Sequence, residues 1–309
     1  MTGVNEFWQR SKRGRAITLP ARPLFDRSTK FFLIGSCFAM EIKNYLRDEA
    51  YIAAPDLAPI SFDPACQNID KLRQYNHVNH FDTFSMRQEF ELGFGERTRR
   101  LADCMATSAR GATGLFPGVA TVEDCYRPYT YASSPEALME LALRIDRVFQ
   151  ASIVQADVIV CTLGLTEVWR RRHVDLLSSV PQPDSVFHRS SFEENLANVR
   201  RMVEMIRSTL PRTEIVLTVS PVPLVRTFTS DDVVVANMES KSILRAVVGE
   251  VCRSDPRIVY FPSYEIAQYH DVFEEDGRHV RREWTRRIFS AFLASCSRTA
   301  SGVSVAEAR

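Results

Sequence analysis

The chain has 309 residues, of which 45% are hydrophobic and 25% are charged, and its formal net charge at pH 7 is +1. This composition indicates a folded globular protein and excludes a disordered or fibrous chain, and the near-zero charge gives no electrostatic reason to expect nucleic acid or an anionic membrane as a partner. No apolar run approaches the ~18 residues that a membrane span requires. The N-terminus lacks the apolar core of a secretory signal, so we expect a cytoplasmic protein.

The cysteine content argues against a structural metal site. Seven cysteines are present, an odd number with scattered spacings and no C-x-x-C pair, and we therefore expect reduced thiols, most of them buried. His77 and His80, followed by Asp82, have the spacing of metal ligands on one helical face. Because no further clear ligand accompanies them, we expect no metal.

The first predicted elements meet at an unusual turn. Residues 1–25 are expected to form a solvated basic arm, residues 31–35 a buried strand and residues 38–49 a helix, and Gly-Ser-Cys joins the last two. A turn at this point needs only the glycine. The adjacent hydroxyl of Ser36 and thiol of Cys37 therefore indicate chemistry.

A long mixed region follows. Residues 51–133 are rich in Pro, Asn, Gly and aromatic residues and contain no long periodic segment. Within this region we expect an extended loop over residues 53–64 and a short helix over residues 83–94. A loop region of this length predicts an inserted segment or cap over a site.

Strands and helices alternate in the second half of the chain. Ser134-Pro135 begins a predicted helix, and Ser191 with Glu194 forms a capping box for another. The predicted helices cover residues 135–156, 192–209, 237–253 and 279–296, and the predicted strands cover residues 157–164, 214–223 and 257–262.

Continuous apolar strands that alternate with amphipathic helices indicate an α/β fold, in which helices cover both faces of a mainly parallel sheet. Three of the strands end in polar or Gly/Pro motifs, namely GSC, TLG at 162–164 and SPVP at 220–223. Open α/β sheets bind ligands beyond the carboxyl ends of their strands, so these motifs predict the place of a site. The sequence contains no G-x-G-x-x-G and no phosphate-binding loop.

A nucleophile needs a base, and the base needs a group that orients it. Asp276 precedes His279 by three residues, just before the last predicted helix. A carboxylate at this spacing reaches one nitrogen of the imidazole across a short turn and leaves the other nitrogen free for a nucleophile. The motif alone is a weak signal, and its value comes from its position at the far end of the chain.

The sequence GSCFA at 35–39 resembles the signature of the GSCFA family, a bacterial branch of the SGNH/GDSL hydrolase superfamily. That superfamily carries a Gly-Asp-Ser nucleophile motif near the start and Asp-x-x-His near the end. The resemblance spans most of residues 31–297. It implies one SGNH-like domain over residues 26–299, with 51–133 as cap or insertion, a tail over 300–309, and a three-layer, flavodoxin-like sandwich. Further segments similar to the family are TLG at 162–164, TVSPV at 218–222, NMESKSILRAV at 237–247 and FPSYEI at 261–266.

Alignment with Gly-Asp-Ser places Cys37 at the nucleophile position and Ser36 at the aspartate position. A helix N-terminus stabilises a thiolate, and a nearby imidazole lowers the pKa of a thiol further. The resemblance thus implies that Cys37 attacks an acyl carbonyl, that His279 accepts and returns the proton, and that Asp276 orients His279. Two alternatives remain: Ser36 is the nucleophile, or Cys37 is a buried small residue and Ser36 an N-cap without catalysis.

The oxyanion donors are less clear. The SGNH pattern supplies an asparagine from a G-x-N-D block, but the corresponding residues here are Gly164, Leu165, Thr166 and Glu167. Gly164 could donate a backbone N–H and Thr166 a hydroxyl. Asn76 or Asn79 could supply the amide instead. Glu167 and Trp169 follow a strand end and are expected either to line the pocket or to lie at the surface and pack.

The resemblance implies an esterase or O-acyltransferase that acts on carbohydrate or glycan esters, as in polysaccharide modification, with no cofactor except acyl-CoA as a candidate co-substrate. The expected partner is a small-molecule or glycan substrate, and the oligomeric state is unknown. A catalytically silent SGNH-like module that binds a glycan or nucleotide-sugar is the alternative. The basic stretch 170–173 is expected to be a solvated loop or an anion contact, and Lys241 matches the family without an assigned role.

Overall fold

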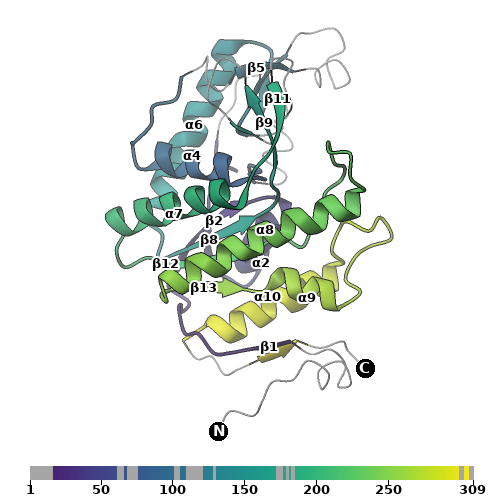
Figure 1. Ribbon diagram of the computed structural model, residues 1–309. Helices are drawn as coiled ribbons and strands as arrows, with labels where there is room; N and C mark the ends of the chain where they lie inside the picture. Colours follow the sequence, from purple (N-terminus) through teal and green to yellow (C-terminus); the bar gives the residue numbers. More distant parts are fainter. Residues whose placement is uncertain are drawn as a thin grey trace.

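Within the described residues of the computed structural model, five parallel strands form the central sheet (Figure 1). Their order across the sheet is β13-β12-β8-β2-β3. Counted along the chain, this is the 2-1-3-4-5 order of a doubly wound, flavodoxin-like sheet, whose strand order reverses between the first and third strands. The strands are β2 (Lys30–Gly35), β3 (Ile52–Ala54), β8 (Val158–Leu163), β12 (Glu214–Val219) and β13 (Ile258–Phe261).

The structure describes residues 17–60, 66–67, 76–100, 105–108, 121–127, 130–171, 177–178, 181, 185–298 and 303–305. Two predicted segments lie partly outside the described residues. These are the expected arm before residue 17 and the basic stretch 170–173 beyond Arg171.

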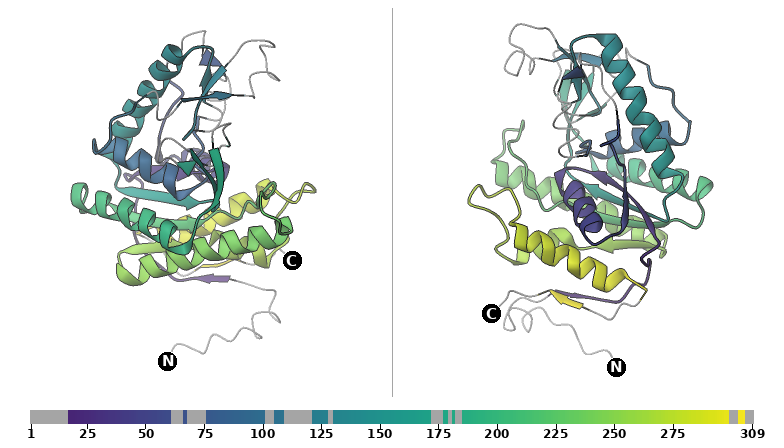
Figure 2. Two further views of the ribbon diagram at one scale, coloured as in Figure 1. Left: turned by 45° about the horizontal axis from the view of Figure 1, so that its top comes forward. Right: turned by 180° about the vertical axis from the view of Figure 1, so that it is seen from behind.

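Helices pack on both faces of the sheet and make a three-layer sandwich (Figure 2). One face packs against α4 (Thr83–Gly93), α6 (Pro135–Ile153), α7 (Phe192–Thr209) and α8 (Val233–Ser254). The other face packs against α2 (Cys37–Asp48), α9 (Ser263–Tyr269) and α10 (Arg282–Cys296). Among the described helices, none is long and apolar enough to span a bilayer.

Successive side chains of a strand point to opposite faces of the sheet, and helices cover both faces here. The apolar strands are therefore buried on both sides. In β2, Phe32 and Ile34 belong to the core beneath α6 and α7, whereas Phe31 and Leu33 belong to the core beneath α2 and α10. The same alternation holds along β8. This confirms the predicted α/β class and the mainly parallel sheet.

The predicted helix starts are also confirmed. The Ser134 side chain accepts a hydrogen bond from the backbone N–H of Ala137, with Pro135 at the first helical position. At α7, the Ser191 side chain accepts from the N–H of Glu194, and the Glu194 carboxylate accepts from the N–H of Ser191. Capping pairs of this kind satisfy the first N–H groups of a helix, which have no partner within it.

The structure adds several strands that sequence patterning did not predict. β3 lies where we expected irregular chain, and it forms the edge of the central sheet. β9 (Glu167–Arg171), β10 (Leu177–Ser178) and β11 (Ser185–Arg189) form a small antiparallel sheet. β4 (Cys66–Gln67), β5 (Met105–Ser108), β6 (Thr121–Asp124) and β7 (Tyr131–Ala132) form another, within the expected insertion. β1 (Ile17–Leu19) pairs with β14 (Val303–Val305), so parts of the expected arm and tail meet.

Candidate functional site

The turn between β2 and α2 leaves no room for a side chain at Gly35. Its φ is 150°, and a Cβ at this position would lie 2.7 Å from both the Cβ and the carbonyl oxygen of Thr162. Glycine is the residue that tolerates both the conformation and the close approach. The tight contact places the end of β2 directly against β8, at the point where the strand order reverses and where doubly wound sheets bind ligands.

The two candidate nucleophiles of this turn differ in exposure. Ser36 is the N-cap of α2, yet its side chain makes no capping hydrogen bond, and the residue is only 4% exposed. Cys37 is the first helical residue and is half-buried. Of the two residues, Cys37 is therefore the more accessible to solvent.

The environment of Cys37 does not by itself produce a thiolate. Burial raises the pKa of the Cys37 thiol, and the positive charge of Arg278 opposes this effect. Ser36 and the backbone N–H of Phe38 also lower the pKa, whereas Glu41 raises it. The net shift is upward, so our expectation that the helix N-terminus lowers the pKa of Cys37 is wrong. The Ser36 hydroxyl lies near the sulfur but makes no hydrogen bond of ordinary geometry.

A segment from the expected insertion runs beneath this turn. The backbone N–H of His80 donates to the carbonyl oxygen of Gly35 at 2.8 Å, and His77 Nε2 lies 3.1 Å from the same oxygen. Farther along, the carbonyl oxygen of Phe81 accepts the N–H of Leu165, just after β8. The segment thus joins the carboxyl ends of β2 and β8 and forms one wall of the site.

His77 is buried beside the candidate nucleophile, but it is a weak base. Burial and the nearby Lys43 hold the pKa of His77 well below its usual value, so the imidazole is neutral. Its Nε2 donates to the Gly35 carbonyl oxygen, which leaves Nδ1 as an acceptor without a partner. His77 therefore fixes the turn in place.

The Asn76 side chain is occupied elsewhere. Its Oδ1 accepts hydrogen bonds from the N–H groups of Leu57 and Ala58, and its Nδ2 donates to Asp56. These contacts close the loop that follows β3. The amide of Asn76, one of the candidate oxyanion donors from the sequence, is thus engaged in the loop after β3. Asn79 is half-buried, and its Oδ1 has no hydrogen-bond partner among the described residues.

The block after β8 has a mainly structural arrangement. A Cβ on Gly164 would lie 2.5 Å from the carbonyl oxygen of Phe81, so only glycine fits there. The N–H of Thr166 donates to the hydroxyl of Ser240 on α8. The two carboxylate oxygens of Glu167 accept from Thr227 and Phe228. Glu167 therefore anchors the loop between β12 and α8, and we do not assign it to a substrate.

The family segment on α8 brings a buried lysine to the same place. Lys241 Nζ donates to the carbonyl oxygen of Gly164 at 2.7 Å, and the residue is 1% exposed. Burial lowers the pKa of Lys241 to about 7, and the charge of the neighbouring Cys37 acts in the opposite direction. A lysine with this pKa exchanges protons near neutral pH. Sequence reasoning had noted Lys241 without a role.

The DxxH motif lies on the solvent side. Asp276 accepts hydrogen bonds from the N–H groups of Arg278 and His279 and pairs with His279 Nδ1. These backbone bonds lower the pKa of Asp276 to about 2. The side chain of His279 is 64% exposed, and no hydrogen bond joins it to Cys37 within the described part of the chain. The residue of this turn whose charge acts on Cys37 is Arg278.

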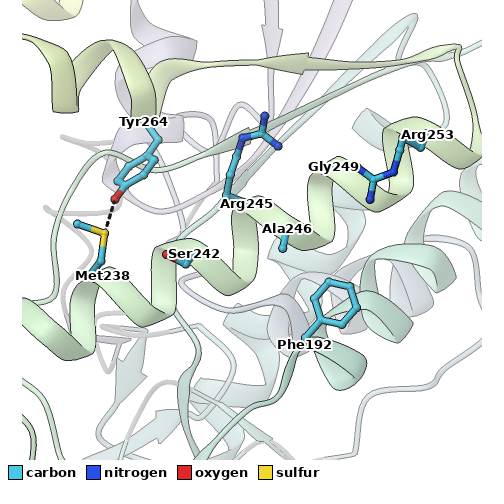
Figure 3. Close-up of a pocket in the computed structure, with 8 residues that line it drawn as sticks. All are labelled: Phe192, Met238, Ser242, Arg245, Ala246, Gly249, Arg253 and Tyr264. Atoms are coloured by element: carbon cyan, nitrogen blue, oxygen red, sulfur yellow. Dashed lines mark hydrogen bonds between the residues drawn. The ribbon is translucent and has the colours of Figure 1, made fainter. Parts of the chain in front are cut away.

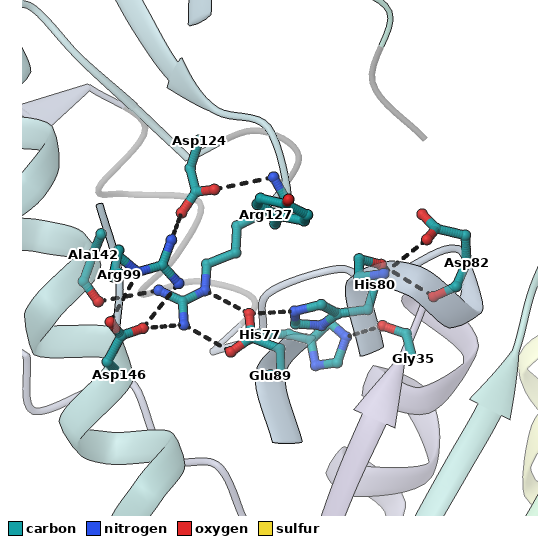
Figure 4. Close-up of polar contacts among 12 residues, drawn as sticks. Gly35, His77, His80, Asp82, Glu89, Arg99, Asp124, Arg127, Ala142 and Asp146 are labelled. Atoms are coloured by element: carbon teal, nitrogen blue, oxygen red, sulfur yellow. Dashed lines mark hydrogen bonds and ion pairs between the residues drawn. The ribbon is translucent and has the colours of Figure 1, made fainter. Parts of the chain in front are cut away.

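Behind the site lies a network of buried charges that sequence reasoning missed (Figure 4). The Arg127 guanidinium pairs with both carboxylate oxygens of Glu89 at 2.8 Å and with Asp146, and His80 Nε2 lies 2.8 Å from Glu89. Burial raises the pKa of Glu89, but Arg127 and His80 lower it by more. The net shift is downward, so the carboxylate stays ionised. Arg99 extends the network to Asp124 and Asp146.

No group of three or more His, Cys, Asp or Glu side chains in the described part of the chain is arranged to hold a metal ion. His77 and His80, which have the spacing of ligands, are engaged by the Gly35 carbonyl oxygen and by Glu89 instead. The two histidines therefore serve two different polar contacts.

A surface groove of about 460 Å³ lies on the outer side of α8 (Figure 3). Arg245 and Tyr264 line the groove, and none of the predicted site residues does. The face of α8 that carries Lys241 is the opposite, buried one. The groove is therefore separate from the candidate site.

Comparison with protein-family models shows the family of the chain. The model of the GSCFA family matches residues 30–292. The chain belongs to the GSCFA family. The match runs from β2 into α10 and includes the turn at Cys37, the block at Gly164, Lys241 and the DxxH motif. Among proteins with curated annotation, none is significantly similar to this chain.

Proposed function

We propose that this GSCFA protein is an acyl-transfer enzyme, an esterase or O-acyltransferase, that forms an acyl-enzyme on Cys37. The observation that supports this most directly is the position of Cys37, a half-buried residue at the start of α2, at the carboxyl edge of a parallel sheet and at its topological switch point. The proposed substrates are carbohydrate or glycan esters, as the SGNH-like resemblance implies, with a thioester such as acyl-CoA as a candidate donor.

The arrangement suits nucleophilic attack on a carbonyl. The first N–H groups of a helix have no partner within it, so the start of α2 offers donors to a developing oxyanion. Arg278 adds a positive charge beside the sulfur. A cysteine is intrinsically a strong nucleophile once it has lost its proton. These features support attack by Cys37 without the asparagine of the G-x-N-D block.

His279 is proposed to act on the solvent side. Asp276 holds its Nδ1, which leaves Nε2 for proton exchange with the leaving group and with the incoming nucleophile. Water as the second nucleophile gives hydrolysis, whereas a sugar hydroxyl gives transfer. We do not assign the first proton, from the thiol, to His279, because the His279 side chain is 64% exposed on the solvent side, whereas the thiol is half-buried.

The test is to incubate the protein with p-nitrophenyl acetate or acetyl-CoA and to measure product release and the mass of the intact protein. We expect a mass increase of about 42 daltons, from an acetyl group in place of the thiol hydrogen, in the wild type, trapped best in His279→Ala, and no adduct in Cys37→Ala. Cys252→Ala is the matched control, since Cys252 is half-buried as well. Retained adduct formation in Cys37→Ala would contradict the proposal.

The second candidate is a catalytically silent module that binds a glycan or nucleotide-sugar. The occupied amide of Asn76 and the missing asparagine after Gly164 favour it, because a standard oxyanion hole is incomplete. Two measurements separate the candidates. A binding module binds a sugar ligand in calorimetry, and equally well in Cys37→Ala. It gives no acyl adduct with either donor.

A further inference from the structure

The amine of Lys241 is buried under the same turn that carries Cys37. Thr162 and Gly35 are paired in the sheet, and Gly164 follows Thr162 by two residues. Because Lys241 Nζ donates to the Gly164 carbonyl oxygen, the amine is held at the carboxyl end of β8, beside the start of α2. The charge of Cys37 acts on the pKa of Lys241, which agrees with this placement, and no hydrogen bond joins the two side chains among the described residues.

The hydrogen bonding of Lys241 leaves room for a second role. Within the described part of the chain, Nζ makes one hydrogen bond, and no carboxylate pairs with it. The acidic and basic neighbours on α8 are engaged elsewhere, Glu239 with Arg189 and Arg245 with Glu265. A neutral amine that donates one N–H still has its lone pair, so it can accept a proton.

We infer that Lys241 is the base that takes the proton of the Cys37 thiol, from the buried side of the site. The inference rests on the proposed role of Cys37 as nucleophile and adds a residue that the DxxH motif does not include. Burial has lowered the pKa of Lys241 to about 7 and raised that of Cys37, so a large share of the amine is unprotonated near neutral pH while the thiol keeps its proton. An unprotonated amine beside an intact thiol is the state that a general base requires.

The proton balance closes over one catalytic cycle. The S–H proton moves to Lys241 Nζ as the sulfur forms a bond to the acyl carbon. The bond from that carbon to the leaving oxygen or sulfur then breaks, and the leaving group takes a proton from His279. In the second half, water or an alcohol gives its proton to His279 and attacks the thioester carbon. The sulfur leaves and recovers its proton from Lys241.

Other groups near the sulfur must be separated from Lys241 in any pH experiment. On α2, Glu41 raises the pKa of Cys37, and on the DxxH turn, Arg278 lowers it. His77 lies below the turn as a neutral imidazole. His279 is on the solvent side, and Lys43 is a second buried lysine, whose pKa burial also lowers to about 7.

The experiment measures the rate of Cys37 alkylation by iodoacetamide between about pH 5.5 and pH 10, by mass spectrometry of the peptide. Alkylation reports the ionisation of the sulfur and needs no acyl transfer. In the wild type we expect an inflection near pH 7, from proton transfer within the Cys37–Lys241 pair. In Lys241→Met the inflection disappears and the rate at pH 7.5 falls about tenfold or more.

Lys241→Arg separates the charge of the lysine from its ability to titrate. Arginine keeps a positive charge but does not lose its proton in this range. We expect alkylation faster than in Lys241→Met but without the inflection near pH 7. An inflection that persists in either Lys241 variant would overturn the inference, because another group would then be the one that titrates.

Two further variants decide the matter even if the Lys241 variants do not fold. His279→Gln changes an exposed side chain, and Lys43→Met removes the other buried lysine, which donates to the carbonyl oxygens of Pro55 and Asn76. We expect both to keep the inflection, and its loss in either one would overturn the inference. Failure of Cys37→Ala to abolish acyl transfer would instead reject the proposed function and leave the alkylation result to stand by itself.

Discussion

His77 and His80 lie three residues apart on one segment, yet they belong to two different polar clusters (Figure 4). His80 contacts the ion network of Glu89 and Arg127, in which each charged group faces an opposite charge, although Nδ1 of His80 itself has no hydrogen-bond partner among the described residues. His77 contacts the turn at Gly35, where the polar atoms His77 Nδ1, Ser36 Oγ and Thr162 Oγ1 are buried without a hydrogen-bond partner among the described residues.

The difference indicates what each cluster contributes. A buried network whose charges are paired holds a structure together, whereas buried polar groups without partners cost stability and persist where function requires them. The first cluster therefore maintains the position of the 76–82 segment. The second cluster, with Lys241 and Cys37, is the one that we propose supplies reactivity. Substitutions in the two clusters should accordingly affect different measurements.

The largest expected effect on stability is in the ion network. Arg127→Met leaves the buried carboxylate of Glu89 without its main counter-charge, and we expect a loss of about 3–5 kcal/mol in the free energy of unfolding. Urea denaturation at pH 7 measures this loss. If the two clusters are separate, the folded variant keeps the pH profile of Cys37 alkylation.

The matched control for Arg127 is an exposed ion pair. Arg253 pairs with Glu250 at 2.7 Å, and its side chain is 72% exposed. Solvent screens such pairs, so Arg253→Met should change the free energy of unfolding by less than about 1 kcal/mol. A similar loss in both variants would show that the network is not a special source of stability.

Lys241→Met should have an intermediate effect that depends on pH. The pKa of Lys241 is about 7 in the folded protein and 10.5 in the unfolded chain, so the unfolded state binds more protons between these values and wild-type stability rises with pH there. The methionine variant lacks this rise. Between pH 7 and about pH 8.5, the stability of the variant relative to the wild type should therefore fall by about 1–2 kcal/mol.

Urea denaturation of both proteins at several pH values in that window checks the prediction. Other titrating groups are common to the two proteins and largely cancel in the difference. A difference that stays constant from pH 7 to pH 8.5 would mean that Lys241 keeps its ordinary pKa in the fold, and the proposed base would then be protonated at neutral pH.

The smallest expected effect on stability belongs to Ser36. Because its hydroxyl makes no capping hydrogen bond and has no partner, Ser36→Ala should change the free energy of unfolding by less than about 1 kcal/mol. Ser36 lowers the pKa of Cys37, so its removal should slow alkylation of the sulfur at a fixed pH. A loss of stability above about 2 kcal/mol, without a change in alkylation, would show instead that Ser36 is a structural cap.

Much of the fold was predictable because its main signals are local. The apolar runs of β2, β8, β12 and β13 and the caps at Ser134 and Ser191 each act within a few residues. β3 was missed because three residues are too few to show a period, and its partner, β2, supplies the pairing. The hairpins between β4 and β7 depend on tertiary contacts in the same way.

The candidate site was predictable only in part. Gly35, Ser36 and Cys37 were recognisable because a turn, a hydroxyl and a thiol adjoin in sequence. The carboxamide of Asn76 is occupied by a loop 18–20 residues away in sequence, which no local pattern reveals. Lys241 is buried although lysine is usually exposed, and only the packing of α8 against Gly164 shows its place.

The central claim is that the environment of the start of α2 makes one thiol chemically reactive, and the most direct measurement compares the thiols of the wild-type protein. Native protein is exposed to a limiting amount of iodoacetamide at pH 7.5, and each cysteine-containing peptide is quantified by mass spectrometry. We predict that Cys37 is alkylated well before Cys252, which is also half-buried and whose pKa burial also raises. Labelling of Cys252 at the same rate or faster would contradict the account.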